Sequence, residues 1–354
     1  MRRPVSRRSF LASPLALYAL SAMSAALPAR RPTGSLTDVP GLKVGHFTFK
    51  ERPTGCTVVL AEKGAVAGVD VRGGAPGTRE TDLLRSEMSV QQVHAISLSG
   101  GSAYGLATAD GVMRYLEEHE IGFPVGPGVV PIVPAAILYD LGLGDSKIRP
   151  GADAGYEAAA AATSKPVALG NVGAGAGATV GKLLGGGRAM KGGLGSASIR
   201  LPNGLVVAAL AAVNAIGDVV DPDTGKILAG ARTTDGSSFA DAMQHIREGA
   251  VMKEASPAEN TTIGVVAANV DWTQSQATKV AQMAHDGLAM AIRPAHMPFD
   301  GDTVFALGTG GVAVDSKLLG YIGALAADVM AQAVVSAILH AESIEGYPAQ
   351  RDVS

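Results

Sequence analysis

The chain has 354 residues, of which 47% are hydrophobic, 17% charged and only 4% aromatic. This apolar content is ample for one large buried core or two smaller ones, and the 46 glycines favour closely packed elements and tight turns. The net charge of −3 offers no basic surface for nucleic acid, so no nucleic-acid partner is expected. The single cysteine, Cys56, excludes an internal disulfide and lies in a strand-like segment, where we expect it to be buried.

Residues 1–29 are predicted to be a signal peptide rather than part of the fold. Residues 6–11 read Ser-Arg-Arg-Ser-Phe-Leu, a twin-arginine pattern, and the apolar run 15–27 is too short and too rich in Ala and Ser for a comfortable membrane span. Removal of residues 1–29 takes away four arginines and no acids, which leaves a net charge of −7. No later stretch is predicted to cross a membrane. We therefore expect a periplasmic or secreted protein, exported already folded, with no stable membrane insertion and a single domain over residues 30–354.

Apolar periodicity and turn residues place the expected elements in chain order. Strands are predicted at residues 42–49, 56–61, 66–71, 95–99, 196–201, 205–212, 261–270 and 302–308. Helices are predicted at residues 103–119, 154–162, 239–248, 274–292 and 317–343. Residues 170–195 are very rich in glycine, and residues 196–212 have the pattern of a hairpin. Together these patterns predict an α/β fold of packed helix and sheet layers without internal repeats.

A small hydroxyl residue marks the point where a polar stretch ends and an apolar strand begins, in the run Asn260-Thr261-Thr262-Ile263. Threonine is a favoured strand residue, so an ordinary strand start has the same pattern. If the chain is cut before Thr261, however, the new N-terminal residue carries a free α-amine beside its own hydroxyl. A nucleophile and a nearby base then belong to one residue, which is a known variant of nucleophilic catalysis.

Other common catalytic motifs are not matched. The glycine-rich run from Gly173 to Lys182 departs from a P-loop, because position 176 is Ala and position 183 is Leu, and it has only a weak dinucleotide fingerprint. The seven histidines show no metal-ligand spacing, and there is no GxSxG elbow of a serine hydrolase. No metal or other cofactor is therefore expected, and we interpret the glycine-rich run as a packed turn near the site.

Two polar patterns at predicted strand ends offer groups that could assist a nucleophile. Asp300-Gly301-Asp302 precedes a strand and is either a solvated turn or a pair of carboxylates that orient an amine and a hydroxyl and relay a proton. Asn214 follows an apolar strand, and it either caps the turn or donates its amide to an oxyanion. At this point both choices stay open.

Six segments together resemble the DmpA-type family of self-processing aminopeptidases, and the match covers nearly all of residues 38–345. These segments are residues 72–82, 98–106, 130–134, 213–222, 260–266 and 293–302. The resemblance implies a four-layer α-β-β-α sandwich of the DmpA and ornithine acetyltransferase type, with helices outside two central sheets. It also implies self-cleavage between Asn260 and Thr261 into an α chain of residues 30–260 and a β chain of residues 261–354. Thr262 remains a second candidate for the new N-terminus.

The same resemblance implies roles for individual residues. Thr261 is the nucleophile, where most family members have serine, and Asn214 matches the oxyanion-stabilising asparagine. Asp300 and Asp302 stand where the family places a serine and a glutamate that support the nucleophile, so the details of the proton relay differ in this chain. Looser matches to the surroundings of the substrate pocket are Tyr139, Gly100, Gly101 and Ser102.

The expected activity is removal of N-terminal residues from small peptides, amino-acid amides or esters through an acyl-enzyme on Thr261. Two alternatives are acyl transfer of the ornithine acetyltransferase type, against which export argues, and a non-catalytic periplasmic binding protein on the same fold. The family also implies a homo-oligomer of processed αβ units. L-α-, D- and β-amino-acid substrates all remain possible, because one methyl group changes pocket preference by only ~1–3 kcal/mol.

Overall fold

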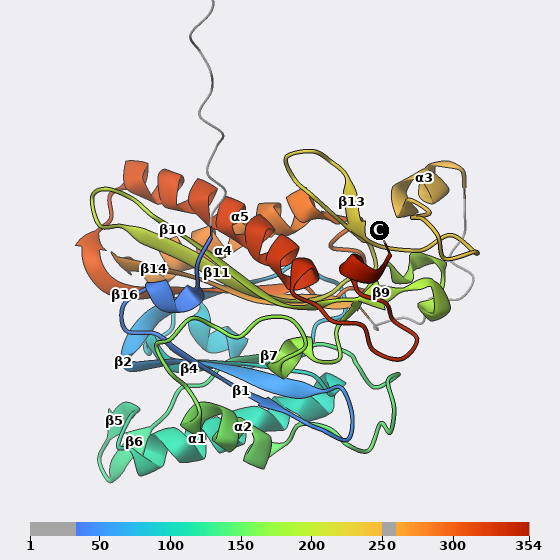
Figure 1. Cartoon of the computed structure of the whole chain (residues 1–354). Coiled ribbons are helices and arrows are strands. Elements are labelled where there is room, and N and C mark those ends of the chain that lie inside the picture. The colour runs from blue at the N-terminus through green and yellow to red at the C-terminus, as the bar shows by residue number, and fades with distance from the viewer. Residues whose placement is uncertain (1–32, 250–259, 354) are drawn as a thin grey trace, which may run out of the picture. The chain divides into compact units, whose positions relative to one another are not determined.

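Nine strands form one continuous hydrogen-bonded ladder in the computed structural model, which describes residues 33–249 and 260–353 (Figure 1). In sheet order they are β10 (Gly193–Arg200), β11 (Val206–Asn214), β14 (Thr261–Asp271), β16 (Thr303–Ala313), β2 (Gly55–Val71), β4 (Gln92–Ser99), β7 (Ala135–Ile137) and β3 (Thr78–Arg79), with β1 (Lys43–Thr48) beside β2. The predicted signal peptide, residues 1–29, lies outside the described residues.

The long strand β2 divides this ladder into two packed layers. Its first half pairs with β1 and its second half pairs with β16, while β4 follows it with a register shift between Leu60 and Ala65. The two strands predicted at 56–61 and 66–71 are therefore one strand. The polar run at residues 62–64 interrupts the apolar pattern in the sequence, but the strand continues through it. Cys56 lies at the start of β2 and is fully buried, as expected.

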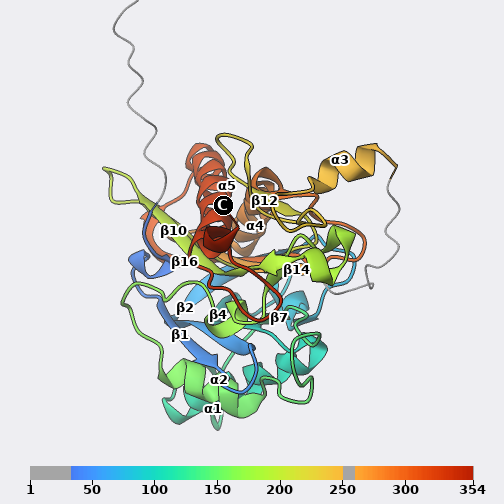
Figure 2. The same cartoon turned by 45° about the vertical axis from the view of Figure 1, so that its right-hand side comes forward.

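Helices cover the outer face of each layer, which gives four layers (Figures 1 and 2). One layer is covered by α4 (Gln274–Ala291) and α5 (Ser316–Leu339), and the other by α1 (Thr108–Glu118) and α2 (Ala152–Ala160). Between the layers, Leu210, Val265 and Phe305 share one buried apolar cluster with Ile96 and Leu98 of the opposite layer. The predicted α-β-β-α sandwich is thus confirmed, and the interior on both sides of the central strands is apolar.

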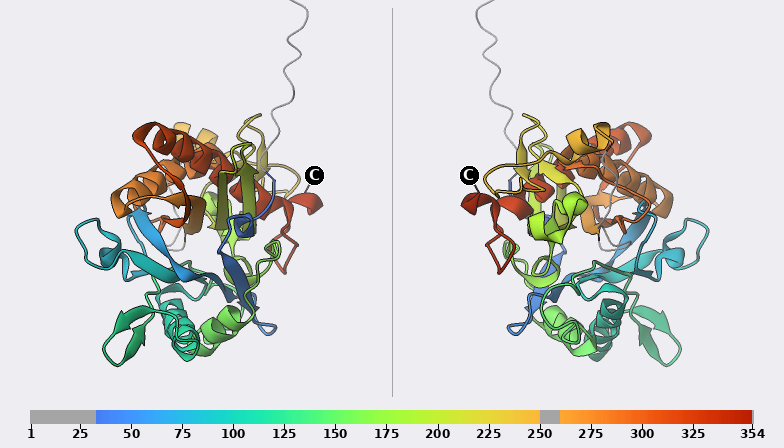
Figure 3. Two further views of the ribbon diagram at one scale, coloured as in Figure 1. Left: turned by 90° about the vertical axis from the view of Figure 1, so that its left-hand side faces the viewer. Right: turned by 90° about the vertical axis from the view of Figure 1, so that its right-hand side faces the viewer.

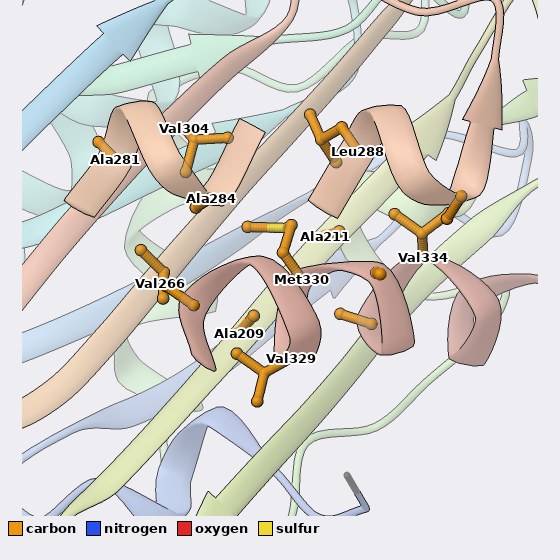
Figure 4. Packing of buried hydrophobic residues seen from close by; sticks show 14 of the residues in the cluster. Ala209, Ala211, Val266, Ala281, Ala284, Leu288, Val304, Val329, Met330 and Val334 are labelled. Carbon is orange, nitrogen blue, oxygen red and sulfur yellow. The ribbon is translucent and has the colours of Figure 1, made fainter. Parts of the chain in front are cut away.

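Small residues let α4 and α5 lie close to each other and to the sheet (Figure 4). A Cβ atom added at Gly287 of α4 would lie 2.2 Å from the carbonyl oxygen of Ala327 of α5, so only glycine permits this approach. The surfaces that meet are made of Ala281, Ala284, Leu288, Val329, Met330 and Val334 on the helices and Ala209, Ala211, Val266 and Val304 on the strands. Alanine and glycine residues thus allow the close contacts between these helices and the sheet.

Helix α5 is long and apolar enough to cross a membrane by length and composition, with a mean hydropathy of 1.9 over its best window. The sequence analysis expected no such segment. In the described fold 67% of that window is buried, because the helix packs on α4, β10 and β11. Burial of this extent is what a core helix shows.

The helix predicted at 103–119 begins later than its apolar spacing suggests. Gly101 and Ser102 have positive φ angles of 84° and 54°, and residues Ser102–Ala107 form a 3-10 helix before α1 begins at Thr108. Helices α1 and α2 then meet at two glycines. A Cβ atom at Gly111 would lie 1.7 Å from the carbonyl oxygen of Ala152, which again excludes any larger residue.

Shorter elements complete the fold. Besides the strands above they are β5 (Phe123–Val125), β6 (Gly128–Val130), β8 (Thr179–Val180), β9 (Met190–Lys191), β12 (Asp218–Val220), β13 (Ile227–Ala229), β15 (Ile292–Arg293) and helix α3 (Ala242–Arg247). Further 3-10 turns are Leu36–Asp38, Thr81–Leu84, Gly173–Gly175, Lys182–Leu184, Gly186–Arg188 and Gln350–Asp352. The hairpin β5–β6 stands away from the main layers (Figure 3). The glycine-rich residues 170–195 are folded into turns and short strands that pack beside the end of β11.

Candidate active site

The sheet register brings the predicted site residues together at the start of β14. This strand lies between β11 and β16, and Asn214 at the end of β11 is the direct partner of Thr261. On the other side β16 runs parallel to β14, because the chain returns through α4, and a bridge pairs Asn260 with Asp300. The run from Asp300 to Asp302 therefore lies alongside residues 260–262.

The hydroxyl group of Thr261 points back at its own preceding peptide group. Its Oγ1 atom donates to the carbonyl oxygen of Asn260 at 2.5 Å, and the N–H of Gly301 donates to the same oxygen at 2.9 Å. Thr261 is 4% exposed. A Cβ atom at position 301 would lie 2.7 Å from this hydroxyl oxygen, so glycine leaves the room that the hydroxyl occupies.

Asp302 is held by three N–H donors. Its Oδ1 atom accepts from the backbone N–H of Thr262 at 2.7 Å. Its Oδ2 atom accepts from the backbone N–H of His296 at 3.1 Å and lies 2.8 Å from the Nδ1 atom of the same residue. Burial lowers the pKa of His296, but the hydrogen bond and charge of Asp302 outweigh it, and the pKa is raised overall. These contacts fix the position of both oxygens of the Asp302 carboxyl group.

Asp300 has a different environment from Asp302. Its Oδ2 atom accepts from the N–H of Met297 at 2.8 Å, whereas its buried Oδ1 atom has no hydrogen-bond partner among the described residues. Burial, followed by the nearby charge of Asp302, raises the pKa of Asp300 to about 7. A carboxyl group with such a pKa can accept and return a proton near neutral pH, which is what a general base must do.

Asn214 is fully buried, and its side-chain amide is fixed in one orientation. The Oδ1 atom accepts from the N–H of Thr179 at 3.0 Å and from the Nζ atom of Lys182 at 2.9 Å. The Nδ2 atom donates to the carbonyl oxygen of Tyr139 at 2.9 Å. Because Oδ1 is held by these donors, the amide nitrogen is the atom that can donate toward the site.

Lys182 was missed as a site residue by the sequence analysis, which treated it only as part of a possible nucleotide motif. Its ammonium group contacts both the backbone and side-chain oxygens of Asn214, and its charge lowers the pKa of Asp300 against the larger effect of burial. Gly181 before it has a φ of 73°, a turn conformation that favours glycine. A lone lysine at the end of a glycine-rich turn was the available signal.

The backbone carbonyl oxygen of Tyr139 contacts the Asn214 amide, whereas the glycine turn at 100–102 contacts residues 138 and 140, on either side of Tyr139. The N–H of Ser102 donates to Leu138 at 3.0 Å, and the N–H of Gly101 donates to the Asp140 carboxylate at 2.9 Å. That carboxylate forms a fully buried ion pair of 2.8 Å with Arg52. The turn thus supports the segment that carries Tyr139.

The loop after β2 closes the site from the opposite side, and its role was not assigned from the sequence. The N–H of Arg72 donates to the carbonyl oxygen of Asp302 at 3.0 Å, and the N–H of Ala75 donates to that of Asp300 at 2.8 Å. A Cβ atom at Gly73 would lie 2.2 Å from the Asp300 carbonyl oxygen, so glycine is required for this approach.

Within residues 33–249 and 260–353 no group of three or more His, Cys, Asp or Glu side chains is arranged to hold a metal ion.

This four-layer fold, with buried polar residues gathered at the start of β14, is that of a family of hydrolases. The chain belongs to peptidase family S58, whose family model matches residues 34–351. It is 46% identical over 345 residues to an uncharacterized aminopeptidase of Mycobacterium tuberculosis, covering 90% of this chain and 97% of the relative. It is 30% identical over 333 residues to a 6-aminohexanoate-oligomer endohydrolase of Kocuria sp. strain KY2, with 87% of both chains covered.

A solved structure supports the fold in particular. The L-aminopeptidase D-Ala-esterase/amidase of Ochrobactrum anthropi, described as a variant of the Ntn-hydrolase fold, superposes with a TM-score of 0.65 at 19% identity and covers 88% of this chain and 87% of its own. The predicted family, the predicted fold and the prediction of a hydrolase are confirmed. Family membership favours hydrolysis over the acetyltransferase and binding-protein alternatives.

Proposed function

We propose that the chain is an exported hydrolase that cuts itself before Thr261 and then removes N-terminal residues from peptides, amides or esters through an acyl-enzyme on that threonine. The contact that carries this proposal joins Thr261 Oγ1 to the carbonyl oxygen of Asn260 at 2.5 Å. It places a hydroxyl group against the peptide bond that self-cleavage must break. The Gly301 N–H on the same oxygen is positioned to stabilise the negative charge that develops there during attack.

Self-cleavage in this arrangement is an acyl shift from nitrogen to oxygen. The Thr261 oxygen bonds to the carbonyl carbon of Asn260, and its proton passes to the Asp300 carboxylate. The carbon–nitrogen bond then breaks, and the departing amine takes up that proton. Water hydrolyses the resulting ester, which leaves a carboxylate on Asn260 and both a hydroxyl and a free α-amine on Thr261.

The surroundings of the two adjacent threonines support cleavage before the first of them. The Thr262 N–H is held by Asp302 at 2.7 Å, and its buried hydroxyl has no hydrogen-bond partner among the described residues. The Thr261 hydroxyl, in contrast, contacts the preceding carbonyl group directly. Asp302 thus anchors the strand one residue after the bond to be cut.

Turnover of a substrate reuses the same groups. The Thr261 hydroxyl attacks the substrate carbonyl while Asp300 or the new α-amine accepts its proton. Asn214 Nδ2 and the Gly301 N–H stabilise the oxyanion, and Lys182 keeps the Asn214 amide oriented. The amine product leaves, and water releases the acyl group.

Intact-mass spectrometry of the purified protein tests the self-cleavage directly. We expect two chains from the wild type, the smaller one beginning at Thr261, and one uncut chain from Thr261→Ala. Thr262→Ala is the matched control, because it removes the neighbouring hydroxyl but not the nucleophile, and it should still be cut at the same bond. Uncut wild-type protein, or a β chain that begins at residue 262, contradicts the proposal.

Substrate, export and assembly need separate measurements. The printed names of the relatives describe an aminopeptidase and an endohydrolase of 6-aminohexanoate oligomers, two kinds of amide substrate. A panel of L-α-, D- and β-amino-acid amides beside 6-aminohexanoate oligomers distinguishes N-terminal from internal cleavage, and acetylornithine with glutamate tests acetyl transfer.

Fractionation of cells that carry Arg7→Lys and Arg8→Lys tests twin-arginine export, and native mass spectrometry tests the proposed homo-oligomer of αβ units.

A further inference from the structure

His296 contacts the Asp302 carboxyl group through two of its nitrogen atoms. Both its backbone N–H and its ring Nδ1 contact the same Asp302 oxygen, Oδ2, at 3.1 and 2.8 Å. The backbone there has a φ of 59°, in the left-handed region that Asn, Asp and His tolerate best among residues with a side chain. The ring is therefore aimed at Asp302 by a local conformation that few residues adopt.

The second ring nitrogen of His296 also faces an acceptor. Its Nε2 atom lies 3.4 Å from the carbonyl oxygen of His285. A neutral imidazole carries only one N–H group and would turn a lone pair toward one of its two acceptors, whereas the imidazolium ion donates to both. The contacts on the two nitrogens thus favour the charged ring.

The neighbouring groups are compatible with a charge on His296. The ring of His285 meets that of His296 edge to face, with 4.8 Å between centroids. Its Nε2 atom contacts the Asp70 carbonyl oxygen at 3.0 Å and lies 3.6 Å from the Asp70 carboxylate, and its Nδ1 atom has no hydrogen-bond partner among the described residues. Burial outweighs the charge of Asp70 and lowers the pKa of His285, which favours the neutral ring. Arg72 opposes a charge on His296, but it is paired with the Asp70 carboxylate at 2.8 Å.

These contacts make the two carboxyl groups of the site unequal. Asp302 receives three N–H donors, two of them from His296, while Asp300 receives one from Met297. When two buried carboxyl groups lie close together, the better solvated one ionises and the other holds the proton. His296 thus provides two of the three donors that hold Asp302.

We propose that His296 is a positioning residue of the active site, which holds the Asp302 carboxyl group in place against the Thr262 N–H, and thereby leaves Asp300 as the carboxyl group that exchanges a proton with Thr261. This rests on the proposed function, because it assigns the proton exchange to the attack by the Thr261 hydroxyl. His296 itself contacts neither the nucleophile nor its peptide group in the described hydrogen bonds.

Two substitutions of nearly equal size test this role. His296→Asn keeps a donor at the position of Nδ1 and tolerates the left-handed backbone, but it is always neutral. His296→Asp fits the same backbone and faces Asp302 with a like charge. We expect the acidic limb of the kcat/KM–pH profile to move up by about one pH unit in His296→Asn, a roughly ten-fold loss at acidic pH with little change on the alkaline plateau. His296→Asp should move it further and slow self-cleavage.

The control is His119→Asn, the same substitution at an exposed histidine beyond α1, which should leave the profile unchanged. A merely structural role of His296 would lower the rate equally at all pH values. Either that result in His296→Asn, or an acidic limb at the wild-type pH in both variants, overturns the assignment.

A titration without turnover separates this inference from the proposed function. In uncut Thr261→Ala protein with ¹⁵N-labelled histidine, the His296 signal is identified by its loss in His296→Asn. Its pKa should lie above the ordinary value of a histidine side chain and should fall when Asp302→Asn is added. A His296 ring whose pKa is not raised refutes the assignment even in an active enzyme. If the wild type neither cuts itself nor hydrolyses any substrate, the proposed function fails, and the role of His296 in proton exchange fails with it. The titration then decides whether His296 is paired with Asp302.

Discussion

A methyl group at position 301 should slow both proposed reactions of the site, self-cleavage and hydrolysis. The Cβ atom of Gly301→Ala would lie 2.7 Å from the Thr261 hydroxyl oxygen, 3.2 Å from its methyl carbon and 3.0 Å from the Ala75 carbonyl oxygen. Gly301 does not have a positive φ, so alanine is compatible with the backbone, and its N–H group is retained. The substitution therefore adds volume beside the nucleophile and changes little else.

The size of the effect follows from these distances. Ordinary contacts of a Cβ atom begin at 3.4 Å, so the hydroxyl group has to move by about 0.7 Å. Displacement of a reacting group by about 1 Å lowers rates by about 10²-fold, so we expect self-cleavage and turnover to slow by roughly 10- to 100-fold. Overpacking of a buried site costs about 1–3 kcal/mol, which lowers Tm by only a few degrees in a chain of this length.

The assay compares Gly301→Ala with Gly320→Ala. Gly320 lies in α5 with nothing within 4 Å of an added Cβ atom, so the same change there should leave cleavage intact and add ~0.5–1 kcal/mol of stability. Time courses of intact mass measure self-cleavage, amide hydrolysis measures turnover, and thermal melts check folding. A Gly301→Ala protein that cuts itself and turns over at the wild-type rate would show that Thr261 is not the reacting hydroxyl.

Three further outcomes follow from the described contacts. Asp300→Asn should slow turnover by about 10²- to 10⁴-fold, as the loss of a general base does. Because the pKa of Asp300 is raised to about 7 in the folded protein, the folded protein keeps a proton on this group between about pH 4 and 7, whereas the unfolded chain has released it. The free energy of unfolding should therefore fall as pH rises through this window, and denaturant titrations of Asp300→Asn should lack that fall. Asn214→Ala should lower kcat by about 10²-fold with little change in KM, since an oxyanion donor acts in the transition state. Lys191 donates to three buried carbonyl oxygens at 2.9 Å each, so Lys191→Met should lower the free energy of unfolding by on the order of 3 kcal/mol, measured as a lower urea midpoint.

Thr261 could be predicted as the nucleophile from the sequence because its signal is local. Thr261 stands at the junction of a polar stretch and an apolar strand, and Asn214 and Asp302 stand at the ends of their own strands, where side chains at one sheet edge are expected. What the linear pattern lacks is the register. Only the parallel pairing of β14 with β16 shows that the N–H of Gly301 lies on the carbonyl of Asn260.

The residues that were missed belong to turns, where periodicity carries no information. Lys182 follows a glycine with a positive φ and begins a three-residue 3-10 turn, and His296 itself has a positive φ, so neither lies on an α-helix or strand whose spacing could direct it to the site. The long strand β2 was divided into two for a related reason. Residues 62–64 have a polar composition typical of a turn. The strand nevertheless continues through them, because β1 and β4 pair with one half of it and β16 with the other.

Under the proposed function, the position of Asn260 links the uncut chain to the active enzyme. Thr261, Asn214 and both carboxyl groups are at most 4% exposed while Asn260 is attached, and the buried Oδ1 atom of Asn260 has no partner among the described residues. If the proposed function holds, a substrate acyl group takes the place that residue 260 occupies, with its carbonyl oxygen on the Gly301 N–H, and self-cleavage and hydrolysis share one oxyanion site. Substitutions at that site should then slow both reactions together, whereas substitutions that only reshape the substrate pocket should slow hydrolysis and leave self-cleavage unchanged.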